Sequence, residues 1–151
     1  MANTQAIATS FKVDLMKGLH ALGTSVIRGS TAKDVFKAAL YVATATINAT
    51  TTAYTATGEA SGTGYTAGGI AATNATEPTS TGTTGFWTPS ATLSWTTVTL
   101  TNVDAVLFYN DTAVGKNSVS VHTFGAQSVV AGNFSLTMPT NDATNALIRL
   151  A

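Results

Sequence analysis

The chain has no cysteine and very little charge. Its 151 residues include seven Lys or Arg, seven Asp or Glu and three prolines, so charged residues make up 9% of the chain and the formal net charge is zero. The absence of cysteine excludes disulfides and thiolate metal sites, and stability must therefore come from packing. The scarcity of basic residues argues against the charged surface of a nucleic-acid-binding protein, so we expect no nucleic-acid partner.

Long apolar runs are also missing. No apolar stretch approaches the ~20 residues of a membrane-spanning helix, and the first ten residues lack the basic and apolar regions of a Sec-type signal. We therefore expect no membrane partner. The length allows one hydrophobic core without help from metals or cross-links. We predict an extended arm at residues 1–9 and a single β-rich domain at residues 10–151.

Short polar side chains take the place of charge. Because 44% of the residues are hydrophobic, the surface must consist largely of Thr, Ser, Asn, Gly and Ala. Such a near-neutral surface repels neighbouring molecules only weakly. The composition favours a protein that packs against copies of itself or against a larger body, and the alternative is a monomer kept soluble by hydroxyl and amide groups.

The start of the chain predicts the only helix. Ser10 is a suitable N-cap, and apolar residues then recur with helical spacing on one face. We predict a helix over residues 11–22 that covers the β core, with Asp14 on its solvent side. The apolar face of this helix is formed by Phe11, Leu15 and Leu19.

Most of the remaining chain has the period of two that is typical of strands. Residues 34–46 alternate in this way, and residues 104–109 are apolar on both faces and should be central. Strands separated by turn residues, without helices between them, indicate a sandwich or barrel. We predict a mainly β, single-domain antiparallel β-sandwich or jelly-roll-like barrel with one N-terminal helix. The later strands are predicted at residues 86–87, 92–101, 104–109, 118–124, 133–138 and 146–150, and residues 73–85 are predicted to be a loop.

A glycine-rich stretch, GEASGTGYTAGG, occupies Gly58 to Gly69. Glycine reaches positive φ without strain and leaves room for another chain segment. We predict a bulged or sharply bent strand here. The stretch lies one residue off the dinucleotide fingerprint, and no helix follows it to bind a phosphate, so we expect no cofactor. The predicted structural residues are Gly62, Gly64, Gly68 and Gly69, which permit a bend and close approach, and Tyr65, which anchors the stretch to the core.

The residues that could support catalysis are few. The two histidines, His20 and His122, lie on different elements and are interpreted as structural, because a metal site would have to gather both with scarce carboxylates. A triad of His122 with Asp104 or Asp111 is possible, but no serine lies on a G-x-S-x-G elbow. We therefore expect no metal site and no enzyme.

Carboxylates and aromatic residues leave two further interpretations. Glu59 and Glu77 could form a glycosidase pair only if the residues between them fold back, so solvated or turn-capping carboxylates are favoured. Trp87 and Trp95 could stack on sugar rings, but no basic residue lies near them in the sequence, as nucleic-acid platforms require. Core packing explains these tryptophans better.

Several sequence blocks resemble a family of small tailed-bacteriophage virion structural proteins. The resemblance spans nearly the whole chain, and its specific parts are the TTAYTATGEASGTGYTAGG block and the closing F-x-x-x-x-P-T-x-D-A-x-N-A-x-I-R pattern. It departs in the Thr-rich residues 73–101 and at Ala60, where Val is common. The blocks that carry the resemblance are SFKVDLMKGLH (residues 10–20), FKAALY (36–41), residues 51–69, LFYND (107–111) and residues 122–151.

The resemblance implies a non-enzymatic virion component made in the host bacterial cytoplasm. Among the roles of such proteins we favour a capsid decoration or cement protein, whose partners would be the major capsid protein and copies of itself in a cyclic oligomer. The alternatives are a head-fibre or tail adhesin that binds host-surface carbohydrate, or a tail or head-to-tail connector component. The candidate interface residues are Asn3, Gln5 and Ile7 of the arm, Glu77 and Pro78 of the loop, and Trp87.

Overall fold

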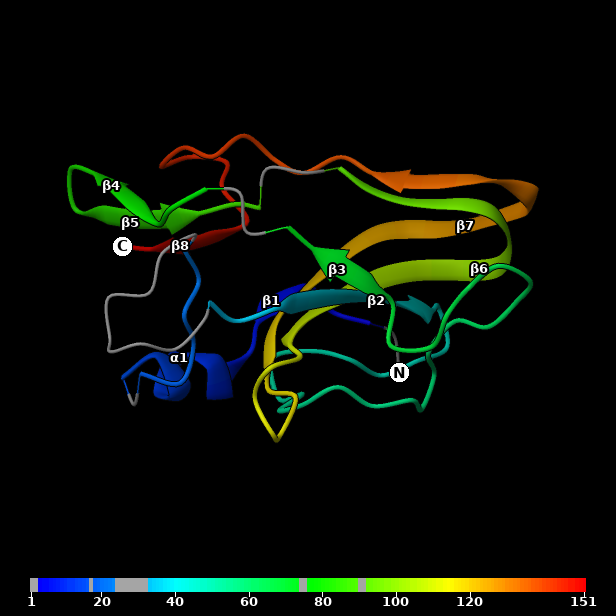
Figure 1. The fold of residues 1–151 in the computed structure, drawn as a ribbon, viewed down its shortest axis with the longest axis horizontal. Coiled ribbons are helices and arrows are strands. Elements are labelled where there is room, and N and C mark those ends of the chain that lie inside the picture. The colour runs from blue at the N-terminus through cyan, green and yellow to red at the C-terminus, as the bar shows by residue number, and fades with distance from the viewer. Residues whose placement is uncertain (1–2, 17, 24–32, 74–75, 90–91) are drawn as a thin grey trace.

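The computed structural model describes residues 3–16, 18–23, 33–73, 76–89 and 92–151. Within these residues the protein is mainly β, with two antiparallel sheets and one short helix near the N-terminus, as predicted (Figure 1). One sheet has the order β1-β7-β6-β2-β3 and the other β4-β5-β8. The elements are β1 (Ala6–Ile7), α1 (Thr9–Met16), β2 (Phe36–Val42), β3 (Ile70–Ala72), β4 (Thr79–Thr81), β5 (Thr84–Trp87), β6 (Leu93–Asn110), β7 (Ser118–Leu136) and β8 (Ile148–Leu150).

Two long strands, β6 and β7, connect the layers of the sandwich. They curve together at one end of the molecule, so that the first half of β6 lies over its second half (Figure 1). The pairing register shifts four times between Trp95 and Ala105, and bulges of this kind bend strands and increase their twist. The strands predicted at residues 92–101 and 104–109 are therefore one strand, as are those at residues 118–124 and 133–138.

The core lies between the layers, and the larger sheet is also covered on its other face. Strand β6 is paired with β7 on one side and β2 on the other. Val106 and Phe108 face the main core, whereas Leu107 and Tyr109 belong to a second cluster that includes Tyr41 and Ile47. The prediction that residues 104–109 form a central strand covered on both faces is confirmed.

The helix is shorter than predicted. It begins at Thr9 and ends at Met16, instead of spanning residues 11–22. Gly18 has a φ of 68°, and its N–H donates to the carbonyl of Leu15, which closes the helix as left-handed glycines commonly do. Phe11 is fully buried and Leu15 packs against the core, but Leu19 lies beyond the helix and is 40% exposed.

The two flanking regions of β3 also differ from prediction. Residues 60–69 form turns instead of a bent strand, because their four glycines, like Gly58 before them, all have positive φ, which an extended ladder does not accept. The predicted loop at residues 73–85 contains β4, which forms a hairpin with β5 around Gly82. Residues 74–75 of that loop lie outside the described residues.

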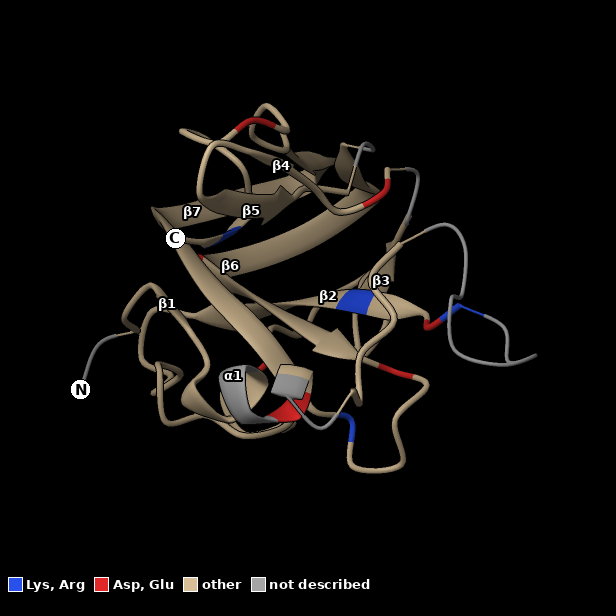
Figure 2. Ribbon diagram, turned by 90° about the vertical axis from the view of Figure 1, so that its left-hand side faces the viewer, with Lys and Arg blue, Asp and Glu red and all other residues tan. Residues whose placement is uncertain are grey.

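Charge is as scarce on the structure as in the sequence. The charged residues are scattered along the described chain, and none lies on β7 (Figure 2). No helix in the described part of the chain is long and apolar enough to span a membrane.

Candidate functional site

The stretch from Gly58 to Gly69, called here the glycine loop, packs directly on backbone. The Thr99 N–H of β6 donates to the carbonyl of Thr63 at 2.9 Å. A Cβ on Gly62 would lie 1.9 Å from the Thr99 carbonyl oxygen, and one on Gly64 would lie 2.5 Å from that of Thr97. The loop therefore covers the edge of β6 at a distance that only glycine allows, which agrees with the predicted close approach.

The other two glycines of the predicted set differ from each other. A Cβ on Gly69 would lie 1.8 Å from the carbonyl oxygen of Ala38 in β2, so this position is also closed by backbone. A Cβ on Gly68 would meet only the hydroxyl of Tyr109, at 3.3 Å. Gly68 is needed mainly for its φ of 87°, whereas Gly69 is needed for space as well.

Tyr65 anchors the loop through its hydroxyl, as predicted. The hydroxyl accepts from the Leu40 N–H at 3.0 Å and lies 2.9 Å from Glu59 Oε1, to which it donates. Glu59 also accepts from the Gly68 N–H at 2.7 Å and from the Tyr54 hydroxyl at 2.6 Å. The carboxylate caps the loop by holding three donors, which matches the favoured interpretation of Glu59 and leaves it poorly placed for glycosidase chemistry.

All four tyrosines of the chain gather around this carboxylate. The Tyr109 hydroxyl donates to the Gly68 carbonyl at 2.8 Å, and the rings of Tyr54 and Tyr109 stack with centroids 5.0 Å apart. Burial raises the pKa of Tyr54 to about 12 and also raises the pKa of Tyr41, Tyr65 and Tyr109. The four phenols are therefore neutral hydrogen-bond donors at neutral pH, and the cluster is suited to holding the loop, not to transferring protons.

A second polar cluster lies under the end of the helix. His20 is buried, and its Nδ1 lies 3.1 Å from Asn110 Nδ2, which also donates to Asp34 Oδ2 at 2.8 Å. Burial lowers the pKa of His20, although the nearby Asp14 and Asp34 oppose that shift. Asp14, predicted on the solvent side, is buried and accepts from Asn117 Nδ2 at 3.0 Å. Among the described residues, no group of three His, Cys, Asp or Glu side chains could hold a metal ion.

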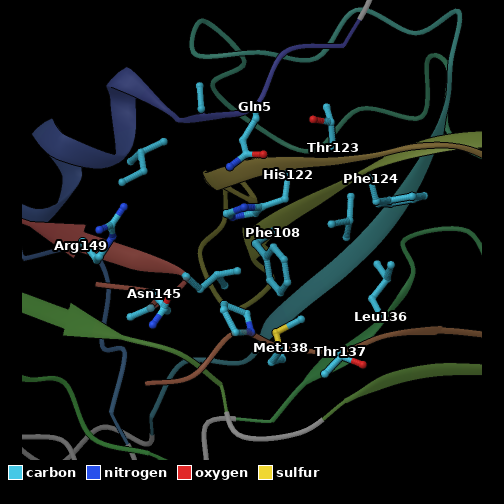
Figure 3. A pocket seen from close by; sticks show the side chains of 16 residues that line it. Gln5, Phe108, His122, Thr123, Phe124, Leu136, Thr137, Met138, Asn145 and Arg149 are labelled. Carbon is cyan, nitrogen blue, oxygen red and sulfur yellow. The ribbon is translucent and has the colours of Figure 1, made fainter. Parts of the chain in front are cut away.

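One pocket of about 530 Å³ opens between the two layers, beside β1 and β7 (Figure 3). Its lining combines ten apolar residues with six polar ones, and Arg149 is the only Lys, Arg, Asp or Glu among them. The apolar lining is formed by Ala6, Ile7, Val106, Phe108, Phe124, Leu136, Met138, Pro139, Ala146 and Leu147, and the polar lining by Gln5, His122, Thr123, Thr137, Asn145 and Arg149.

His122 lies in this pocket edge-on to Phe108, with ring centroids 5.7 Å apart. Its Nε2 is 3.0 Å from the hydroxyl of Ser120, which is fully buried. The carboxylates considered as triad partners are used elsewhere, since Asp104 accepts from Asn3 and Asp111 pairs with Lys37 at 3.0 Å and with Lys116. The Ser120–His122 pair therefore has neither an orienting acid from these residues nor an exposed nucleophile.

The burial of His122 predicts a loss of stability in acid. Burial lowers its pKa to about 4, below the ordinary value of 6.5, so the unfolded chain binds a proton more readily than the folded one. Stability from this group is complete above pH 6.5 and falls as the pH drops towards 4, by about 2 kcal/mol. Urea unfolding at a series of pH values measures the effect, with His122→Gln as the control that should flatten this part of the profile. An unchanged slope in that variant would contradict the assignment.

The arm residues lie on the chain's own sheet. Asn3 is buried, donating to the Val42 carbonyl at 3.1 Å and to Asp104, and accepting from the Ile47 N–H at 3.2 Å. This corrects the prediction of Asn3 as an interface residue, because its hydrogen-bonding groups are used internally. Gln5 is exposed and Ile7 is half-buried, and both line the pocket. Residues 1–2 of the predicted arm lie outside the described residues.

The tryptophans are core residues. Trp87 is 2% exposed, packs against Phe36 with centroids 5.7 Å apart and donates from Nε1 to the Thr76 carbonyl at 3.0 Å. Trp95 is 3% exposed. Trp87 is therefore not an interface residue, because the β5 pairing turns its ring inward. Glu77 and Pro78 are exposed beside β4, so these two members of the predicted interface lie at the surface.

The sequence interpretation missed two features that the structure brings together. The convergence of four tyrosines on Glu59 had no local signal except the position of Glu59 within the glycine loop. The length of β7 and of its open edge was not predicted, because glycines such as Gly125 and Gly132 indicate turns in the sequence. In the structure the strand continues through both of them. No protein-family model, curated protein or solved structure matches this chain, so its own geometry carries the functional argument.

Proposed function

We propose that this protein is a non-enzymatic structural protein of a tailed-bacteriophage virion, a decoration or cement protein that binds the outside of the major capsid protein lattice. The observation that carries the proposal is a β-sandwich whose surface has few, scattered charges and an exposed turn, residues 77–78, directly before β4 (Figure 2). Such a surface binds through shape and backbone hydrogen bonds, and one small domain could in this way contact many nearly equivalent sites.

The internal use of the reactive groups supports a structural role. Glu59 holds three donors of the glycine loop, and Asp111 is paired with two lysines. His20 contacts Asn110 inside the fold, and the hydroxyl beside His122 belongs to the buried Ser120. Because these groups form hydrogen bonds and ion pairs within the fold, they support a structural role.

The buried tryptophans count against the adhesin alternative. A carbohydrate-binding adhesin needs exposed aromatic rings on which sugars can stack, and Trp87 and Trp95 are the candidates for them. Both rings lie in the core. The connector alternative differs from the decoration role chiefly in copy number, which an experiment can measure.

Copy number per particle tests the proposal. Virions that carry this chain are purified, and its abundance is measured against the major capsid protein by gel densitometry and quantitative mass spectrometry. A decoration protein is expected at hundreds of copies, whereas a ring-shaped connector would give about six or twelve. A few dozen copies or fewer would contradict the decoration role, and the tail tube protein in the same sample serves as the internal standard.

The exposed turn before β4 provides a direct test of capsid contact. We expect that Glu77→Lys combined with Pro78→Ser weakens binding to undecorated capsids, because both residues are exposed. The melting temperature of the variant is measured alongside, since both side chains also lie against Gly23 and a loss of stability must be separated from a loss of contact. Thr96→Lys, at an exposed position on β6, is the matched surface control. Equal binding by the Glu77 and Thr96 variants would remove this turn from the interface without affecting the copy-number test.

A further inference from the structure

The outer edge of β7, on the side away from β6, is open over most of its length. Strand β1 covers it only at Ser120 and Val121. Residue 4 does not extend this pairing, because the Thr4 N–H donates to the Ile47 carbonyl and not to β7. Residues 122–136, called here the β7 edge, have no strand on that side within the described part of the chain.

Beyond the two residues that pair with β1, the backbone groups on the same side of β7 have no partner strand in the described structure. Val121 pairs with Ala6 across the edge. Because backbone groups in a strand alternate in direction with a period of two, the N–H and C=O of Thr123 point to the same side as those of Val121. They lie next to the pocket, whose wall includes Thr123 and Phe124.

The corresponding edge of β6 is covered. On the β6 side of the β6–β7 pair, the Thr99 N–H donates to the Thr63 carbonyl of the glycine loop. Gly62 and Gly64 lie against the carbonyls of Thr99 and Thr97. The fold thus uses a dedicated loop to close one edge of this pair and leaves the other edge open.

Apart from the bulges in its pairing with β6, the β7 edge lacks the devices that normally protect a strand edge. Natural edges are short or carry charged residues or proline. The edge strands β3 and β4 have three residues each, with Pro78 directly before β4, and β8 has three residues including Arg149. By contrast, β7 has 19 residues and contains no Lys, Arg, Asp, Glu or Pro.

We propose that the β7 edge pairs antiparallel with the same edge of a second copy of this chain, across a two-fold axis. A second copy fits the charge pattern, because an edge without charge meets its own equivalent without repulsion and offers nothing to attract a strongly charged partner. Antiparallel pairing of identical strands is self-complementary and closes as a dimer. The zero net charge of the chain adds no long-range repulsion between copies.

This inference specifies the self-association that the composition of the chain predicts, and it rests on the proposed function only for its place in the virion, so the two can fail separately. A chain that does not pair in solution would overturn the dimer and say nothing against a high copy number in virions. A low copy number would overturn the decoration role and say nothing against the dimer. The experiment below uses only the purified full-length chain.

Charge placed on the edge tests the pairing. Ala126 and Gln127 are exposed and have no side-chain hydrogen bond among those found in the described structure. In sedimentation equilibrium we expect the unmodified chain to show twice its 15.4 kDa mass, and the double variant Ala126→Lys/Gln127→Lys to dimerise at least about tenfold more weakly. An equal mixture of this variant with Ala126→Glu/Gln127→Glu should restore the two-chain mass, because the opposite charges then face each other.

The matched control carries the same charges on the neighbouring strand. Thr96→Lys/Thr101→Lys adds two lysines at exposed positions of β6 and should dimerise like the unmodified chain. Hydrogen exchange provides a second readout that needs no variant, since amides of residues 122–128 should become more protected as protein concentration rises while those of residues 97–101 stay constant. The proposal is overturned by an unmodified chain that remains single at about 100 µM, by no recovery in the mixture, or by equal weakening in the control.

Discussion

A methyl group at position 69 is expected to prevent stable folding of the chain. In Gly69→Ala the added Cβ would lie 1.8 Å from the Ala38 carbonyl oxygen and 2.7 Å from the Ala39 Cα, which are backbone atoms inside β2. Neither atom can move without breaking the pairing of β2 with β3 or β6. The residue also has a φ of 71°, where a side chain adds strain. We expect a loss of more than about 4 kcal/mol in the free energy of unfolding.

Gly82→Ala is the matched control for this substitution. Gly82 has a similar φ of 59°, but a Cβ there would meet nothing within 4 Å. Its variant should lose only the backbone strain, about 1 to 2 kcal/mol. Urea unfolding followed by circular dichroism measures both. A Gly69 variant as stable as the Gly82 variant would show that the glycine loop does not press on β2.

The remaining glycines should rank by the atoms they face. Gly62 and Gly64 lie against backbone carbonyls of β6 and belong with Gly69, whereas Gly68 faces only the Tyr109 hydroxyl. The four positions therefore differ, although the sequence presents them as equivalent.

Removal of the Glu59 carboxylate is expected to release the glycine loop. Glu59→Ala leaves the hydroxyls of Tyr54 and Tyr65 and the N–H of Gly68 without their acceptor. Hydrogen bonds to a charged group contribute about 1.5 to 3 kcal/mol each, and partial solvation of the freed donors reduces the sum. We expect a loss of about 3 to 5 kcal/mol in the free energy of unfolding.

The conservative variant and a titration separate this role from general packing. Glu59→Gln keeps one acceptor oxygen and should lose only about 1 to 2 kcal/mol. Glu59 also helps to hold the pKa of Tyr54 at about 12, in addition to the larger effect of burial. The Tyr54 pKa should therefore move down towards its ordinary value of 10 in Glu59→Ala, as followed by tyrosinate absorbance. An unchanged Tyr54 pKa together with unchanged stability would show that the Glu59 carboxylate does not hold the glycine loop.

The mainly β class could be predicted because it depends on local pattern. Residues 36–42 alternate between two apolar faces, and the two-sided apolar run at 104–109 could only be a covered central strand. The need for glycine in the glycine loop was visible for the same reason, since positive φ is a property of single residues.

The tertiary structure decided which segments meet. The burial of Asn3 and Trp87 depends on partners distant in the sequence, and so do the carbonyls that press on Gly62 and Gly69. The tertiary structure also decided that β6 and β7 continue through residues that are typical of turns. Bulges and turns use the same residue types, and only continued pairing with the neighbouring strand distinguishes a bulge from a turn. The sequence by itself therefore determined which faces are apolar and where the backbone must be glycine, whereas only the pairing of distant strands decided which edge is covered and which is left open.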